Sequence, residues 1–158
     1  MKSKLFLFCF SLFICSLALN PSEYLSVVPS SLSEGTTAEY SFKFGTTQHI
    51  PDHGHIVIQF PKEIVDFGSL PDCMVSIGGL AAVKTPCTRS FQGEFTDVIL
   101  SLGTIAVKSY VITVPGVVNP LNVSSSGNFK VYAKKYHQVV EDSWGFEGIA
   151  FTSGPRKS

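Results

Sequence analysis

The feature of this sequence that most restricts its fold is an alternation of apolar and polar side chains with a period of two. Over residues 38–44, Ala, Tyr, Phe and Phe occupy every second position, with Glu, Ser and Lys between them. The same period recurs at residues 55–60 and 129–134. Because successive side chains of a β-strand point to opposite faces, this period indicates strands with one buried and one solvated face.

Turn-forming residues separate the alternating runs, and 13 Gly and 9 Pro punctuate the chain. No segment shows a convincing helical period. Further strands are expected at residues 25–28, 73–77, 98–102 and 110–114, with a last strand or pair within 144–151. About eight short strands at fairly regular spacing predict an all-β fold, an immunoglobulin-like antiparallel β-sandwich.

The N-terminus has the pattern of a secretory signal peptide. Two lysines precede an apolar run at residues 5–19, and Ser16 and Ala18 are the small residues expected before a cut after Ala18. The run is shorter than the roughly 20 residues that a transmembrane helix needs, and an uncleaved signal anchor is the alternative. We expect removal of residues 1–18, and secretion of residues 19–158 as a single domain that is extracellular or associated with the cell surface.

The charge of the processed chain limits its partners. Cleavage removes two of the 12 basic residues and none of the 12 acidic ones. A slightly negative chain argues against nucleic acid or an anionic membrane as the main partner, because both recruit clustered Lys and Arg. No second hydrophobic segment follows the first, so no membrane span is expected after processing.

Two of the four cysteines lie within the predicted signal peptide, which leaves Cys73 and Cys87. An even count in an oxidising compartment predicts a disulfide between them. The bond would close a loop of 15 residues, counted from Cys73 to Cys87. In the chain-entropy model, closing a loop of that length contributes about 3 kcal/mol to the stability of the fold. Half of a metal site is the alternative, although the CxxC spacing typical of zinc is absent. We expect the bridge to pin a loop beside the sheets instead of joining them through the core.

Three histidines and an aspartate form the one constellation that could carry chemistry: His49, Asp52, His53 and His55. Imidazoles two and four residues apart could face one cation, as in a metalloenzyme or hydrolase. The Pro and Gly among them favour a turn that enters the strand at residues 55–60. We therefore predict no metal and no cofactor, and keep the histidines as weak candidates.

Other polar and aromatic positions have simpler interpretations. Asn122 begins an Asn-Val-Ser sequon in a Ser- and Gly-rich connector and is predicted to carry a glycan. The acid Asp97 and the Glu141-Asp142 pair are interpreted as solvated turn residues. Four aromatic residues could form a sugar-stacking platform, although such residues are more often core or half-buried strand positions. These are Tyr110, Tyr132, Tyr136 and Trp144.

The order of these motifs resembles a β-sandwich unit that recurs in large modular surface proteins of single-celled eukaryotes. The resemblance spans roughly residues 24–133. Its motifs are Tyr40-Ser41-Phe42, Ile50-Pro51 with Gly54, Ile56 to Pro61, the Cys73 and Cys87 pair, Ile112-Thr113-Val114 and Val118-Asn119-Pro120. It implies an extracellular structural or adhesive role and transfers no catalytic residue.

Together these features predict a secreted, non-enzymatic β-sandwich that acts by surface contact with an extracellular protein or glycan, in a coat, matrix or adhesive assembly. An outer edge strand at residues 25–28 could pair with a neighbouring chain. The alternative is a soluble carrier or lectin that binds lipid or glycan. A cavity lined by Phe42, Ile58 and Phe129 would favour that carrier, whereas a filled core would favour the contact module.

Overall fold

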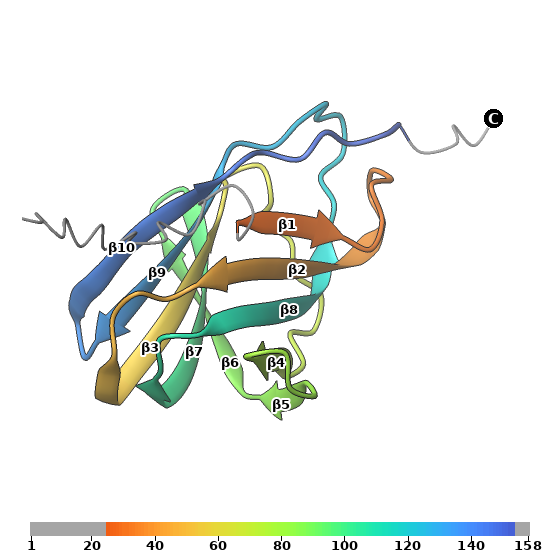
Figure 1. Ribbon diagram of the computed structural model, residues 1–158. Coiled ribbons are helices and arrows are strands. Elements are labelled where there is room, and N and C mark those ends of the chain that lie inside the picture. Colours follow the sequence, from red (N-terminus) through yellow and green to blue (C-terminus); the bar gives the residue numbers. More distant parts are fainter. Residues whose placement is uncertain (1–24, 154–158) are drawn as a thin grey trace, which may run out of the picture.

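The computed structural model describes residues 25–153, apart from the side chains of residues 142–144 (Figure 1). The predicted signal peptide lies outside these residues. The described chain contains ten strands and no helix, and so has no helix that could cross a membrane. The strands are β1 (Ser26–Pro29), β2 (Thr37–Gly45), β3 (Ile50–Phe60), β4 (Cys73–Ile77), β5 (Val83–Thr85), β6 (Cys87–Gln92), β7 (Phe95–Ile105), β8 (Ser109–Val118), β9 (Phe129–Lys135) and β10 (Gln138–Phe146).

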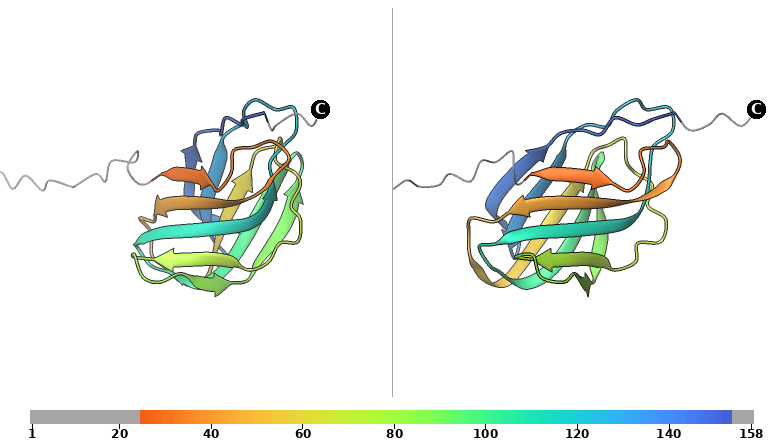
Figure 2. Two further views of the ribbon diagram at one scale, coloured as in Figure 1. Left: turned by 90° about the vertical axis from the view of Figure 1, so that its right-hand side faces the viewer. Right: turned by 45° about the vertical axis from the view of Figure 1, so that its right-hand side comes forward.

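The strands form two five-stranded sheets that pack face to face (Figure 2). One sheet has the order β1-β2-β8-β4-β5, and the other has the order β10-β9-β3-β7-β6. Within each sheet all neighbours are antiparallel. The predicted fold class, an immunoglobulin-like antiparallel β-sandwich, is confirmed, with ten strands in place of about eight.

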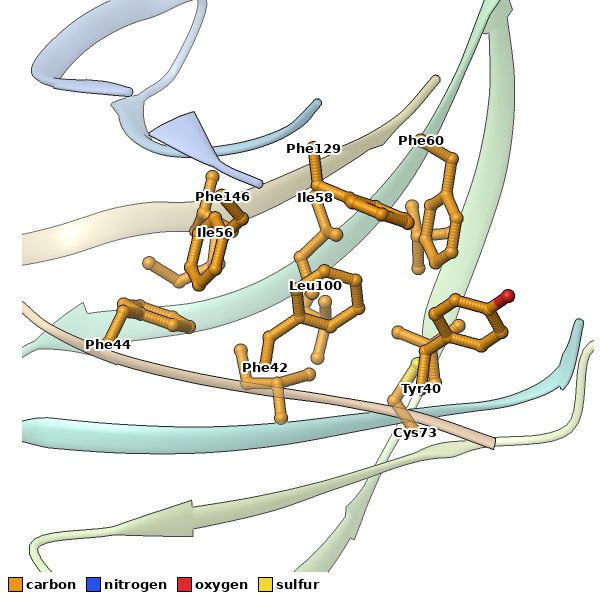
Figure 3. Close-up of a cluster of buried hydrophobic side chains, with 14 of the residues drawn as sticks. Tyr40, Phe42, Phe44, Ile56, Ile58, Phe60, Cys73, Leu100, Phe129 and Phe146 are labelled. Atoms are coloured by element: carbon orange, nitrogen blue, oxygen red, sulfur yellow. The ribbon is translucent and has the colours of Figure 1, made fainter. Parts of the chain in front are cut away.

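Aromatic rings fill the space between the sheets (Figure 3). The predicted inward positions of β2 are buried, and Phe42 is fully enclosed in the cluster. Its ring meets those of Phe60, Phe129 and Phe146 edge to face, with centroids 5.5 to 5.7 Å apart. This arrangement is the one that aromatic quadrupoles favour. Phe42, Ile58 and Phe129, which would have lined a cavity in a carrier, are therefore part of a packed core.

The sequence predicted no strand in residues 83–92, where the structure has β5 and β6. Most side chains of both strands are exposed, so neither shows the alternation that marks a half-buried strand. The chain leaves the first sheet after β5 and enters the second sheet at β6, with Pro86 between them. One side of the sandwich is thus spanned by a continuous stretch of chain.

The predicted disulfide joins Cys73 of β4 to Cys87 of β6, with 5.9 Å between their Cα atoms. The expectation that it would pin a loop beside the sheets is wrong. The two cysteines belong to strands of different sheets, and Cys73 is fully buried within the core cluster (Figure 3). The bridge therefore ties the two layers together beside the crossover at Pro86.

Three strands begin at least three residues earlier than the sequence indicated. β3 includes residues 50–54, which the sequence pattern predicted to be a turn. The pattern was misleading because a bulge interrupts the apolar alternation there. β7 begins at Phe95, so Asp97 belongs to a strand instead of a turn. β10 begins at Gln138 and carries two register shifts, which also obscure its period.

Candidate functional site

The histidine segment is a bulged part of β3. The pairing of β3 with β7 shifts register on both sides of Gly54. A Cβ at Gly54 would lie 2.8 Å from the carbonyl oxygen of Gly103, so the close approach of the two strands requires glycine here. His53 has a φ of 50°, in the left-handed region that non-glycine residues rarely adopt.

The three histidines have separate environments. His55 Nδ1 lies 2.9 Å from the Oγ of Ser101 on β7. The ring of His53 stacks on Tyr136, with centroids 4.4 Å apart, and His49 is exposed in the connection before β3. Among the described residues, no three His, Cys, Asp or Glu side chains lie close enough to hold a metal ion together. The weak metal candidates are thus dispersed.

Contacts of His53 and Asp52 fasten the bulge to the hairpin between β9 and β10. Besides stacking on His53, Tyr136 donates its backbone N–H to the His53 carbonyl oxygen over 3.2 Å. Lys135 Nζ lies 2.7 Å from Asp52, and this hydrogen bond holds the pKa of the exposed Asp52 carboxyl below its ordinary value. Asp52 and His53 therefore both have partners within the chain. Their contacts are explained by a structural role, which is to hold the bulge of β3 against the hairpin.

Asp97 is buried, which corrects its interpretation as a solvated turn acid. Only 3% of the residue is exposed. Gln59 donates to Oδ1 over 3.1 Å, and the Tyr132 hydroxyl donates to Oδ2 over 3.0 Å. Burial, reinforced by the charge and hydrogen bond of Asp97, raises the pKa of Tyr132 to about 12. Both carboxylate oxygens therefore have donors from other strands of the same sheet, β3 and β9.

Glu141 is also buried, and its interpretation as a turn residue is likewise wrong. Its carboxylate accepts hydrogen bonds from the backbone N–H of Thr47 at 2.6 Å, from the Thr47 hydroxyl at 2.7 Å and from the N–H of Gln48 at 3.3 Å. This acid holds the connection between β2 and β3. Its oxygens are occupied, so the geometry assigns it a structural role.

The tyrosines considered for a sugar platform do not share a face. Tyr110 is buried, and its hydroxyl donates to the carbonyl oxygen of Ala106. Tyr132 binds Asp97, and Tyr136 stacks on His53. The side chain of Trp144 lies outside the described part of the structure. The three described rings therefore serve different local contacts.

Asn122 lies exposed in the connection between β8 and β9, with a φ of 58°. An exposed sequon in a connection is accessible to a glycosyltransferase, and Asn tolerates the left-handed region better than most residues. The geometry is compatible with the predicted modification, which stays a prediction.

The remaining candidates are the open edges of the two sheets. In the described chain these are β1 and β5 in one sheet and β10 and β6 in the other. The predicted edge position of residues 25–28 therefore agrees with the structure. A groove between β1 and β10 is lined in part by Leu25, Val27, Phe146 and Ile149.

Exposed apolar side chains accompany β5 and β6, on the side where the chain crosses between sheets. Leu80 is 70% exposed, Val83 64% and Phe91 62%. Arg89 of β6 lies between two rings, with its guanidinium carbon 5.3 Å from the centroid of Phe91 and 5.6 Å from that of Phe67. Sequence reasoning missed this arrangement because it had no strand there.

Comparisons with known proteins identify no family. No family model and no curated protein matches the chain. Among solved structures, it is similar to AvmM, which catalyses macrocyclization in alchivemycin A biosynthesis, with 14% identity over 85% of this chain and 88% of that chain, and a TM-score of 0.38.

Two bacterial pilins are also similar in structure. The major pilin SpaA of Corynebacterium diphtheriae shares 13% identity over 73% of this chain, with a TM-score of 0.47. BcpA, the major pilin subunit of Bacillus cereus, shares 12% identity over 80% of this chain, with a TM-score of 0.43. This chain spans 32% of the SpaA chain and 39% of the BcpA chain. Likenesses this distant say nothing about what the chain binds or does.

Proposed function

We propose that this protein is a secreted, non-catalytic β-sandwich that works by surface contact with another extracellular macromolecule, in a coat, matrix or adhesive assembly. The observation that carries the proposal is the distribution of its polar groups. The buried acids Asp97 and Glu141 are each engaged by hydrogen-bond donors, and the histidines are dispersed. Catalysis usually requires at least two titratable groups brought together with shifted pKa values.

The packing of the core favours contact over transport. A carrier that encloses a lipid or glycan needs an interior chamber, usually of several hundred Å³. Here the rings of Phe42, Phe60 and Phe129 contact one another between the sheets. Recognition is then left to the outer faces, the connections and the sheet edges.

The proposed location outside the cell has support from the covalent chemistry of the chain. A disulfide persists in oxidising compartments such as the extracellular space, and this one joins both sheets. The N-terminal signal pattern and the exposed Asn122 sequon fit the same compartment.

Binding of the folded, labelled domain to its biological surroundings tests this proposal. Residues 19–158, produced by secretion, are incubated with intact cells of the source organism and with their cell-free extracellular matrix. We expect saturable binding that unlabelled protein displaces and that the reduced, unfolded domain does not show. A folded domain that binds neither material would contradict the proposal, and so would turnover of a substrate by the domain alone.

A further inference from the structure

The hairpin between β6 and β7 shows which backbone groups of β6 are unpaired. Gln92 and Phe95 face each other across a two-residue turn, so they form a hydrogen-bonded pair. Hydrogen bonding alternates along an antiparallel strand, so Ser90 also directs its N–H and C=O toward β7. The N–H and C=O groups of Arg89 and Phe91 therefore point away from the sheet, toward the open edge.

The other three edges have features that hinder pairing with another chain. β1 has four residues and ends in Pro29. The Ser30 N–H bonds to β2, so by alternation the nitrogen of Pro29 faces the open edge and offers no donor. β5 has three residues, and β10 carries two register shifts. Short strands, edge prolines and bulges are the usual protection of sheet edges. β6 has six residues, no proline and no register shift.

The side chains of Arg89 and Phe91 add a recognition element to this edge. They lie two residues apart on the same face of β6, and the Phe91 ring is mostly exposed. Arg89 also donates from Nη1 to the carbonyl oxygen of Phe67 over 3.0 Å, which fixes the guanidinium beside both rings. If a second copy of the strand lies antiparallel beside the first, the cation of each copy can contact the exposed ring of the other copy.

We propose that β6 pairs in antiparallel fashion with β6 of a second copy, around a two-fold axis at Ser90, and joins the two five-stranded sheets into one. This inference rests on the proposed contact function and names a second copy of the chain as a partner. In this register, Arg89 of each copy lies opposite Phe91 of the other, and the two Ser90 residues face each other. A register centred on Arg89 would instead place two guanidinium groups opposite each other, which is destabilising.

A cysteine at the symmetry axis tests the register directly. Facing residues of a non-hydrogen-bonded pair have Cβ atoms about 4.5–5.5 Å apart, so Ser90→Cys should form an intermolecular disulfide under mild oxidation. In the matched control Thr88→Cys, the two cysteines would lie four residues out of register, roughly 13 Å apart along the strands. That separation exceeds the reach of a disulfide. Peptide mapping checks that the native Cys73 and Cys87 bond is retained.

Charge substitutions at Phe91 test the cross-strand contact, with sedimentation equilibrium measuring the dimer dissociation constant. Phe91→Lys places a cation opposite Arg89 of the other copy and should weaken the dimer at least tenfold. Phe91→Glu places a carboxylate there and should retain the dimer. Circular dichroism of both variants checks that the monomer folds. Equal weakening by Lys and Glu, or cross-linking of Thr88→Cys as efficient as that of Ser90→Cys, would overturn the proposed register.

The outcome is separable from that of the proposed function. A wild-type domain that stays monomeric up to millimolar concentration but binds cells or matrix would overturn pairing through β6 and leave the contact function standing. A domain that dimerises through Ser90 but binds neither cells nor matrix would support the strand pairing and contradict attachment to those materials.

Discussion

The hydroxyl of Tyr40 donates a hydrogen bond of 2.6 Å to Oδ1 of Asn119, 79 positions away in the sequence. Both residues are buried, and burial raises the pKa of the Tyr40 hydroxyl, so it stays a donor through the physiological range. Asn119 Nδ2 donates in turn to the carbonyl oxygens of Ser31 and Ser33, each at 2.9 Å. The amide therefore joins β2, the end of β8 and the connection after β1.

Replacing Tyr40 by Phe should lower the free energy of unfolding by about 1–3 kcal/mol, because it leaves the buried Asn119 oxygen without its phenolic donor. Asn119→Ala should also destabilise the protein, since it removes the donors to Ser31 and Ser33. Urea unfolding of both single variants and the double variant measures the coupling between the two side chains. Effects that add with no coupling would show that the contact does not contribute.

Loss of the disulfide should destabilise the domain by about 3 kcal/mol, the loop-closure contribution expected for its length. Cys73→Ala/Cys87→Ala should unfold at lower urea concentration than the oxidised protein. Reductant should shift the midpoint of the wild-type protein and leave that of the variant unchanged. Peptide mapping that finds the two thiols free in the secreted protein would contradict the bond itself.

Stability should fall as the pH rises above about 10, the ordinary pKa of a tyrosine. Burial raises the pKa values of Tyr110 and Tyr132 in the folded protein, to about 12 for Tyr132. Between these values the unfolded chain releases phenolic protons that the folded chain retains, so alkali favours unfolding. Urea unfolding from about pH 9 to about pH 12 measures this loss. Tyr132→Phe should reduce its slope, and an unchanged slope would contradict the assignment.

The double variant His53→Ala/His55→Ala should keep the fold and the binding to cells or matrix. Ala at position 53 loses the stacking on Tyr136 and tolerates the left-handed φ less well than His, whereas His55 contacts only Ser101 among the described hydrogen-bond partners, so we expect a loss of about 1–2 kcal/mol that leaves the domain folded. Zinc should leave the melting temperature of the wild-type domain unchanged. A stoichiometric metal that the variant loses together with a measurable activity would overturn this interpretation.

The Asn122 sequon should carry a glycan when a eukaryotic host secretes the protein. Ser124→Ala removes the sequon without changing the residue at the positive φ, so it should reduce the mass by that of the glycan and preserve the fold. Asn122→Gln removes the acceptor and serves as the second variant. If the mass of either variant differs from that of the wild-type protein only by the amino-acid substitution, no glycan has been lost. That result would contradict the modification.

Where one face of a strand is buried, the sequence predicts the fold well. Residues 38–44, 55–60 and 129–134 keep the period of two, and the structure has strands in all three segments. The signal is lost where both faces of a strand are exposed, as in β5 and β6, or where a bulge breaks the period, as in β3.

The candidate site was less predictable, because its determinants are distant in sequence. Asp97 and Glu141 have the composition of turn acids, and only folding brings Tyr132 to one and Thr47 to the other. Asn119 entered the sequence reasoning only within a Val-Asn-Pro motif, with no sign of its side-chain hydrogen bonds to Tyr40, Ser31 and Ser33. The role of Arg89 and Phe91 as a recognition element could be predicted only by knowing that β6 is an edge strand.

The covalent link between β4 and β6 also sets a limit on how far the domain can stretch. Under tension between its two ends, the noncovalent pairs of both sheets can separate one after another, but the segment between Cys73 and Cys87 stays closed. Fourteen residue steps, roughly 45–50 Å of contour length, are then withheld from extension. A molecule anchored in a coat or matrix would thus extend less under force than the same chain without the disulfide, and it would begin refolding with this loop already closed. A reductant that opened the loop would remove both effects.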